Sequence, residues 1–117
     1  MKIEVIKYNQ EWDFHNRFRV LIMNEGKVAA SACLCEYEQD IVIEEVYVQP
    51  EYRNKGVGSI LMAELQQMGL MYTEISLKVK RDNKYAIKLY EKWGFEAYRI
   101  EEPGIYEWMK FRNQEKI

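Results

Sequence analysis

The stretch VYVQPEYRNKGVGS at residues 46–59 decides how this sequence folds. It opens with β-branched and aromatic residues, passes through a proline, and closes with two glycines one residue apart, Gly56 and Gly58. This pattern is typical of a strand that runs through a glycine-bearing loop directly into a helix. Such a junction presents free backbone N–H groups to an anion, and Arg53 and Lys55 add positive charge beside them. The stretch therefore predicts a nest for a pyrophosphate.

On both sides of this stretch, the period of the apolar residues separates strands from helices. Two downstream segments show helical spacing; Gly69 suits the left-handed position that closes the first helix, and Gly94 ends the second. Asp82 or Asn83 can cap the second helix. The expected strands are Lys2–Tyr8, Arg17–Met23, Lys27–Tyr37, Ile41–Val48, Glu74–Lys80, Phe95–Ile100 and Ile105–Phe111, and the first helix begins at Val57.

The resulting order, β-β-β-β-α-β-α-β-β, predicts an α+β fold. A meander followed by a βαβ crossover implies a mixed, mostly antiparallel sheet with helices packed on it. The length of 117 residues favours a single domain over residues 1–117, because a much smaller core rarely stabilises a fold alone. Nothing along the chain marks a linker, a repeat or a low-complexity segment.

The composition excludes several classes of protein. With 17 Lys plus Arg against 19 Asp plus Glu, the net charge of −2 argues against a nucleic-acid binder. No apolar run approaches the ~20 residues that span a bilayer, and the N-terminus does not resemble a signal peptide. Cys33 and Cys35 are too few for a zinc site, so we expect no metal and two buried thiols in a cytoplasmic protein.

The two glycines alone leave the ligand open. A phosphate-binding loop of the Walker A type needs a different spacing, and the dinucleotide fingerprint fails because Leu61 stands at its third glycine position. A tight turn before an ordinary helix explains Gly56 and Gly58 equally well. A nucleotide-binding domain that uses the nest for ATP therefore stays an alternative.

Two motifs together narrow the choice. Arg53-x-x-Gly56-x-Gly58, which follows a strand and Pro50, resembles the acyl-CoA signature of the GNAT superfamily of N-acetyltransferases. The stretch NKYAIKLYEKWGF at residues 83–95 is similar to the second CoA motif of that superfamily, Asn-x-x-Ala-x-x-x-Tyr-x-x-x-Gly-Phe. The resemblance covers about Ile41 to Phe111 and implies a GNAT-like fold with acetyl-CoA as acyl donor.

The resemblance also implies a donor site. Backbone groups of the strand before the loop would pair with the pantetheine arm, backbone amides from Arg53 to Ser59 would hold the pyrophosphate, and Asn83 would contact the cofactor from the second helix. Together with Tyr90, the implied cofactor-binding residues are Val46, Tyr47, Val48, Arg53, Asn54, Lys55, Gly56, Val57, Gly58, Ser59 and Asn83.

For catalysis, the resemblance implies direct transfer to a primary amine without a covalent enzyme intermediate. Tyr90 would protonate the departing thiolate, although a core aromatic on an apolar helix stripe explains it too. An acceptor amine of pKa ~10.4 must lose a proton before it attacks. On strict alternation Glu44 and Glu45 lie on opposite faces, so we favour Glu44 as base because it would share a face with Val46 and Val48.

The acceptor half departs from the family pattern. GNAT proteins usually place two helices between their first and second strands, whereas about eight residues separate Tyr8 from Arg17 here. The expected acceptor is an amine-bearing small molecule or a protein amine. Alternatively, a second subunit closes the acceptor side in a homodimer, and aromatics such as Trp12, Phe14 and Trp108 would form that contact. A non-catalytic acyl-CoA-binding regulatory module is the alternative function. His15, the only histidine, is expected at the surface.

Overall fold

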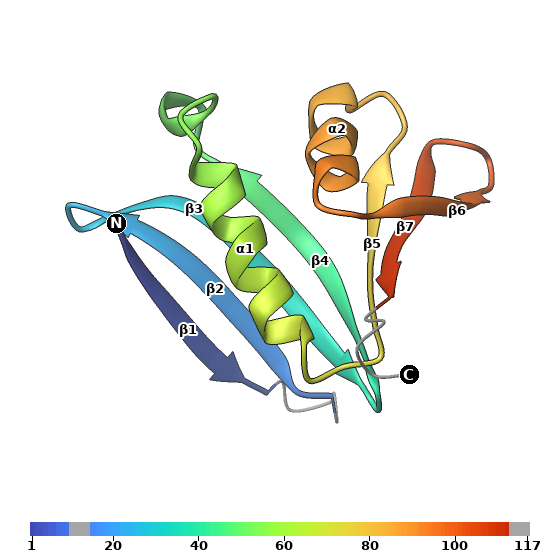
Figure 1. The fold of residues 1–117 in the computed structure, drawn as a ribbon, viewed down its shortest axis with the longest axis horizontal. Helices are drawn as coiled ribbons and strands as arrows, with labels where there is room; N and C mark the ends of the chain where they lie inside the picture. Colours follow the sequence, from blue (N-terminus) through green and yellow to red (C-terminus); the bar gives the residue numbers. More distant parts are fainter. Residues whose placement is uncertain (10–14, 113–117) are drawn as a thin grey trace.

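A computed structural model gives the structure of residues 1–9 and 15–112. One seven-stranded sheet, in the order β1-β2-β3-β4-β5-β7-β6, carries two α-helices (Figure 1). The strands are β1 (Lys2–Tyr8), β2 (Arg17–Asn24), β3 (Lys27–Tyr37), β4 (Asp40–Val48), β5 (Glu74–Lys80), β6 (Glu96–Glu101) and β7 (Tyr106–Arg112), and the helices are α1 (Val57–Gly69), α2 (Lys84–Lys92) and the 3-10 turn η1 (Pro50–Tyr52).

The predicted α+β architecture is confirmed. The first four strands form an antiparallel meander, β4 and β5 pair in parallel, and β7 pairs antiparallel with both β5 and β6. The connection from β4 through α1 to β5 is the expected βαβ crossover. Each predicted strand and helix is present, with ends that differ by one residue at most positions, and only η1 was not predicted.

Gly69 does not have the predicted left-handed conformation. It is the last residue of α1, and the helix ends at Leu70 with φ −61° and ψ −21°, which is right-handed. A glycine is needed there for space, because a Cβ at Gly69 would lie 2.0 Å from Cδ1 of the buried Ile75. The close approach of α1 to β5 therefore explains the residue that the sequence suggested as a cap.

The strands β4 and β5 separate halfway along their length. Their pairing runs from Asp40 opposite Glu74 to Ile43 opposite Leu77, although β4 continues to Val48 and β5 to Lys80. Figure 1 shows the two strands side by side at one end and diverging towards α2 at the other. The next residues past the last pair are Glu44 on β4 and Lys78 on β5.

A β-bulge in β4 changes which side chains face the helices. Against β3, Ile43 pairs with Leu34 and Glu45 with Cys33, so Glu44 is the extra residue. Ile41 and Ile43 therefore lie on the same face as Val46 and Val48, whereas strict alternation would place them on opposite faces. All four positions are buried or half-buried. The prediction that Glu44 shares a face with Val46 and Val48 is wrong, because strict alternation does not hold across a bulge.

Helix α1 covers one face of β2, β3 and β4 (Figure 1). Its buried residues Val57, Leu61 and Leu65 follow helical spacing and pack into the core with Val20 and Ile22 of β2. Each fully buried aliphatic side chain contributes roughly 1.5–3 kcal/mol, so this stripe fixes where α1 begins. None of the helices within the described residues is long and apolar enough to cross a membrane.

Candidate active site

The loop before α1 turns its backbone N–H groups outward. Gly56, the N-cap of α1, has φ 81°, and the first intrahelical hydrogen bond runs from the Ile60 amide to the Gly56 carbonyl at 3.2 Å. The amides of Val57, Gly58 and Ser59 precede that bond and have no acceptor within the helix. With the positive end of the helix dipole beside them, these amides have an arrangement that suits an anion. The pyrophosphate nest stays a prediction.

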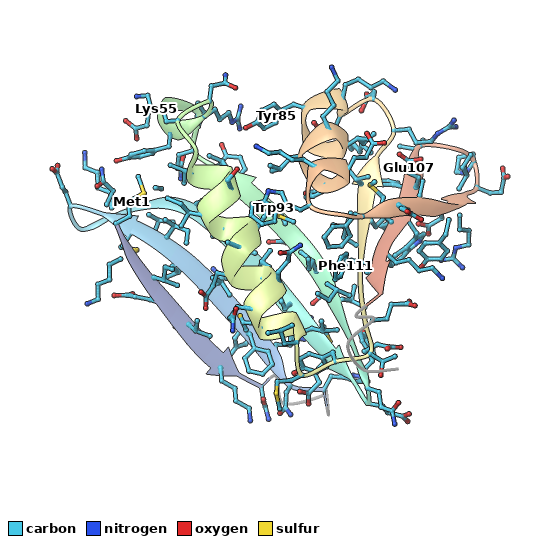
Figure 2. The ribbon with its side chains drawn as sticks, viewed as in Figure 1. Met1, Lys55, Tyr85, Trp93, Glu107 and Phe111 are labelled. Carbon is cyan, nitrogen blue, oxygen red and sulfur yellow. The ribbon has the colours of Figure 1, made fainter. Side chains whose placement is uncertain are left out.

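The Arg53 side chain reaches back to β4. Its Nε donates a hydrogen bond to the Val48 carbonyl at 2.9 Å, and its guanidinium carbon lies 5.5 Å from the centroid of the Tyr47 ring. The arginine thus connects the loop to the end of β4. Its charge lies at the edge of the gap, which is the space between β4 and α2 beyond the last β4–β5 pair. Asn54 and Lys55 remain exposed on the loop, and Figure 2 shows Lys55 on one side of the gap and Tyr85 of α2 on the other.

The backbone of β4 is open towards the gap at two of the predicted residues. The Gln49 amide donates to the Ala29 carbonyl of the strand before it at 2.9 Å, so Gln49 and, by alternation, Tyr47 direct their backbone groups to β3. Val46 and Val48 then direct theirs away from β3, as the Arg53 bond to the Val48 carbonyl shows directly. Beyond the last β4–β5 pair, these groups lie at an open sheet edge.

Helix α2 supplies the opposite wall. Its N-cap Asn83 accepts a hydrogen bond from the Ala86 amide on its side-chain oxygen at 3.1 Å, so the residue is held at the start of the helix. A cavity of 340 Å³ lies between this helix and β4. It is lined by Val46, Tyr47, Val48, Arg53, Asn83, Tyr85, Ala86, Leu89 and Tyr90.

Tyr90 lines this cavity from the interior. Its side chain is 6% exposed and packs against Phe95, with ring centroids 6.0 Å apart. Burial removes water from the phenolate and raises the pKa of Tyr90 to about 12. The sequence suggested either a core aromatic or a residue near the cofactor, and Tyr90 lies in the core and also lines the cavity. Its phenol stays protonated near neutral pH.

A second cavity continues the first past the start of α1. Its volume is 370 Å³, and it shares Tyr85 and Leu89 with the first cavity while Gly56, Gly58 and Ser59 line its other side. Lys88 and Lys92 of α2 also line it, which the sequence analysis missed. The i, i+4 spacing of these two lysines, one turn from Tyr85 and Leu89, was the signal that they share the face turned to the nest.

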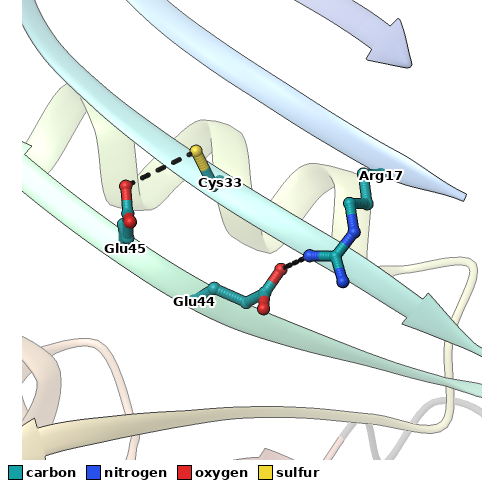
Figure 3. Close-up of polar contacts among 4 residues, drawn as sticks. All are labelled: Arg17, Cys33, Glu44 and Glu45. Carbon is teal, nitrogen blue, oxygen red and sulfur yellow. Dashed lines mark hydrogen bonds and ion pairs between the residues drawn. The ribbon is translucent and has the colours of Figure 1, made fainter. Parts of the chain in front are cut away.

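Glu44 and Glu45 both point to the sheet face away from α1 (Figure 3). The Arg17 guanidinium forms an ion pair with Oε1 of Glu44, and the Cys33 thiol donates to Oε2 of Glu45 at 3.8 Å. Because Arg17 and Cys33 belong to one face of β2 and β3, the prediction that the two glutamates lie on opposite faces is wrong. The bulge is again the cause.

Glu44 opens onto a third cavity on that face. Its volume is 510 Å³, and Tyr37, Val42, Ile43, Lys78 and Trp108 line it with Glu44. Val46, Val48, Asn83 and Tyr90 are therefore brought together on the helix side of the gap, whereas Glu44 stands on the other side, at the point where β4 and β5 part.

The remaining predicted residues lie outside the helix-side cavities or outside the described residues. Cys33 and Cys35 are buried thiols on one face, as predicted, and burial raises the pKa of Cys33. His15 is exposed, with its ring centroid 4.3 Å from that of Tyr37. Trp108 is half-buried, and Trp12 and Phe14 lie outside the described residues.

Comparison with known proteins places this geometry among acyltransferases. The family model described as Acetyltransferase (GNAT) family matches residues 2–95. Thialysine N-epsilon-acetyltransferases of Bos taurus and Sus scrofa are each 34% identical to the chain over 58 residues, which is 48% of this chain and 34% of theirs. The chain thus spans about a third of the length of the curated relatives it matches.

Solved structures share the fold at low sequence identity. PaiA N-acetyltransferase from Thermoplasma acidophilum, in complex with coenzyme A, superimposes with a TM-score of 0.77 at 20% identity, over 83% of this chain and 61% of that one. A GNAT family acetyltransferase from Elizabethkingia anophelis, with acetyl-CoA bound, gives a TM-score of 0.73 at 12% identity, over 95% of this chain and 98% of that one. Chains of this length therefore occur with the same fold.

Proposed function

Because the chain belongs to the GNAT acetyltransferase family, we propose that it moves an acetyl group from acetyl-CoA to a primary amine. The observation that carries the proposal is the continuity of two features along one gap. The open backbone edge at Val46 and Val48 leads through two adjoining cavities to the amide nest at Gly56–Ser59. An extended pantetheine arm suits the first feature and a pyrophosphate suits the second.

The residues of the gap fit the donor chemically. Backbone N–H and C=O groups of Val46 and Val48 would pair with the amides of the pantetheine arm as an added strand does. The amides of Val57, Gly58 and Ser59 would hold the diphosphate, with Lys88 and Lys92 facing it across the cavity. Asn83 and Leu89 would line the arm, and Tyr90 would close the inner end.

Direct transfer accounts for the placement of Tyr90. The amine nitrogen forms a bond to the thioester carbonyl carbon, the carbon–sulfur bond breaks, and the sulfur leaves as a thiolate. A strand amide near Val48 would stabilise the oxyanion, and the protonated Tyr90 phenol would donate a proton to the sulfur. The cavity position supports this role, and the phenol keeps its proton near neutral pH.

Glu44 is proposed as the group that takes the proton from the amine, directly or through a water. It stands where β4 and β5 part, on the face away from the helices. Arg17 pairs with Oε1 of its carboxylate, and a carboxylate can accept further hydrogen bonds. The acceptor is a small molecule or a protein with a primary amine, the acceptor class that the names of the curated relatives indicate for those proteins.

An acceptor screen tests the proposal. The protein is incubated with acetyl-CoA and a panel of primary amines, and free thiol release is followed. Tyr90→Phe keeps the ring and removes the proton, so turnover should fall about 10²- to 10⁴-fold while calorimetric acetyl-CoA binding stays within about twofold. Equal turnover of the two proteins would remove Tyr90 from the mechanism.

The alternative, a binding module that holds acyl-CoA without turnover, gives a different result. It predicts acetyl-CoA binding and no thiol release with any amine of the panel. The short connection between Tyr8 and Arg17 favours this alternative, because GNAT proteins usually build part of the acceptor side there. Tighter binding of ATP than of acetyl-CoA in the same calorimeter would instead indicate a nucleotide-binding domain.

A further inference from the structure

We propose that the acceptor carries an anionic group, a carboxylate, in addition to its amine, and that Lys78 recognises this group. The inference rests on the proposed function and concerns the cavity on the face away from the helices. A carboxylate-bearing amine is a narrower class than amines in general. It excludes polyamines as preferred acceptors.

The position of Lys78 is the first argument. Ile43 and Leu77 form the last β4–β5 pair, so Glu44 and Lys78 are the first residues past it on their strands. Both line the same 510 Å³ cavity. An acceptor that enters from this face to reach the gap passes between a carboxylate on one wall and an ammonium on the other.

The chemistry around Lys78 keeps its charge available. Its Nζ lies 3.5 Å from Oε2 of Glu101 and 4.8 Å from the Tyr106 ring centroid, and its side chain is 41% exposed. An ammonium has three donors, and an ion pair whose side chains are 41% and 43% exposed is weak, although Oε2 of Glu101 is itself buried with no hydrogen-bond partner among the described residues. Lys78 can therefore donate to a second anion without losing its position over the aromatic ring.

Two cationic side chains lie near Trp108 at the same end of the cavity, and the Glu101 carboxylate beside Lys78 offsets one of them. The Arg99 guanidinium carbon lies 5.4 Å from the Trp108 ring centroid, and Nζ of Lys78 lies 6.0 Å from it. Trp108 itself lines the cavity. A second ammonium of a polyamine would meet like charges at this end, whereas a carboxylate would meet opposite ones.

The charge at the other end suits the amine. Arg17 pairs with Oε1 of Glu44, and a carboxylate accepts several hydrogen bonds, so Glu44 can also accept from an ammonium or from the attacking amine. The two ends of the cavity thus match the two ends of an amino acid-like acceptor.

The test uses acceptors that differ only in charge. Linear ω-amino acids of three to six carbons, their amides and the diamines of the same length are compared in turnover with acetyl-CoA, and by NMR titration into protein saturated with CoA. We expect the acid to exceed the amide, and the amide to exceed the diamine, by about fivefold each at one length or more, since a partly exposed charge pair contributes up to about 1 kcal/mol.

Three variants assign the effect. Lys78→Gln should bring the acid-to-amide ratio close to one in both binding and turnover and leave CoA affinity unchanged. Glu101→Gln removes the competing carboxylate and should raise the ratio. Lys80→Gln is the matched control, because Lys80 is exposed on the same strand face and does not line the cavity.

The outcomes separate the two proposals. Three outcomes overturn the inference. They are equal binding and turnover of acid and amide in the wild-type protein, an unchanged acid-to-amide ratio in Lys78→Gln, and no acceptor binding to the CoA-loaded protein. If no thiol is released but the NMR titration shows that the protein prefers the acid and that this preference depends on Lys78, the proposed enzyme is overturned and the recognition site is kept. Turnover without any charge preference keeps the enzyme and overturns the site.

Discussion

Single residues in the gap are explained by backbone geometry and burial more than by their chemical type. Gly56 is required because φ is 81° there. The pKa of Tyr90 is high because only 6% of the residue is exposed, and burial disfavours the charged phenolate. Arg53 contributes through its bond to the Val48 carbonyl. At this scale the structure gives each motif residue a specific local cause.

Gly56 allows a matched test of the amide nest. Gly26, in the β2–β3 turn, has φ 79°, and at both glycines a Cβ would meet nothing within 4 Å. Alanine at either position should cost about 1–2 kcal/mol of folding free energy from the left-handed backbone alone. Gly56→Ala should also weaken CoA binding about tenfold, equivalent to about 1.4 kcal/mol.

Urea unfolding and calorimetry with CoA measure both effects. Gly26→Ala is the control, because Gly26 carries the same backbone strain but lines neither cavity of the proposed donor site, so CoA affinity should stay unchanged. Equal CoA affinity in the two variants would argue that the amides near Gly56 do not contact the ligand.

Among the elements, β4 positions the site because its two edges have different partners. Tyr47 directs its backbone groups to β3, whereas Val46 and Val48 direct theirs to the gap. The bulge at Glu44 lies between the paired and the open parts of the strand. It turns both glutamates to one face and the two valines to the other.

Amide hydrogen exchange can detect this difference within one strand. The amides of Val46 and Val48 should exchange readily in the free protein and slow by at least about fivefold with saturating CoA, as one new hydrogen bond of about 1 kcal/mol requires. The Tyr47 amide, bonded to β3, should be protected in both states. Slowing of Tyr47 alone would contradict the strand-like placement of the ligand.

The contact between α1 and β5 gives a stability prediction. Gly69→Ala should gain up to about 1 kcal/mol of helix propensity but lose about 1–3 kcal/mol to overpacking against Ile75, for a net destabilisation of about 1 kcal/mol. In the Ile75→Val background the loss should shrink, because the methyl that lies 2.0 Å from the added Cβ is removed.

Denaturant midpoints of the four proteins in this cycle provide the measurement. A stabilised Gly69→Ala single variant would show that helix propensity, rather than space, governs this position.

On the scale of the whole molecule, the fold brings two faces of one sheet to a single opening. The helix-covered face provides the nest and Tyr90, and the other face provides Glu44, Lys78 and Trp108. Tyr90 also belongs to the core cluster with Phe95, so the chemistry of the site is coupled to the stability of the fold.

This coupling predicts a pH dependence of stability. The pKa of Tyr90 is raised from 10.0 to about 12 in the folded protein, so its contribution is complete below pH 10 and is lost as the pH rises towards 12. The wild-type protein should therefore lose about 1 kcal/mol relative to Tyr90→Phe between pH 9.5 and 11.

Urea unfolding of both proteins at pH 7, 9.5 and 11 tests this sign. Tyr72, whose pKa is also raised to about 12, is present in both proteins and cancels in the comparison. A difference that stays constant with pH would show that the Tyr90 hydroxyl has access to water in the folded state.

The sequence by itself determined the order of the elements, the α+β fold and the motif residues from which the donor site is proposed. These features follow from local patterns in the sequence. The patterns are runs of β-branched residues, apolar residues at helical spacing, and two glycines that stand between a strand and a helix. Only the tertiary structure decided the bulge at Glu44, the space-limited role of Gly69, and the cavity that Glu44 and Lys78 both line. Each of those depends on which strand lies beside which and in what register, and residues 34 positions apart carry no local signal of such an encounter.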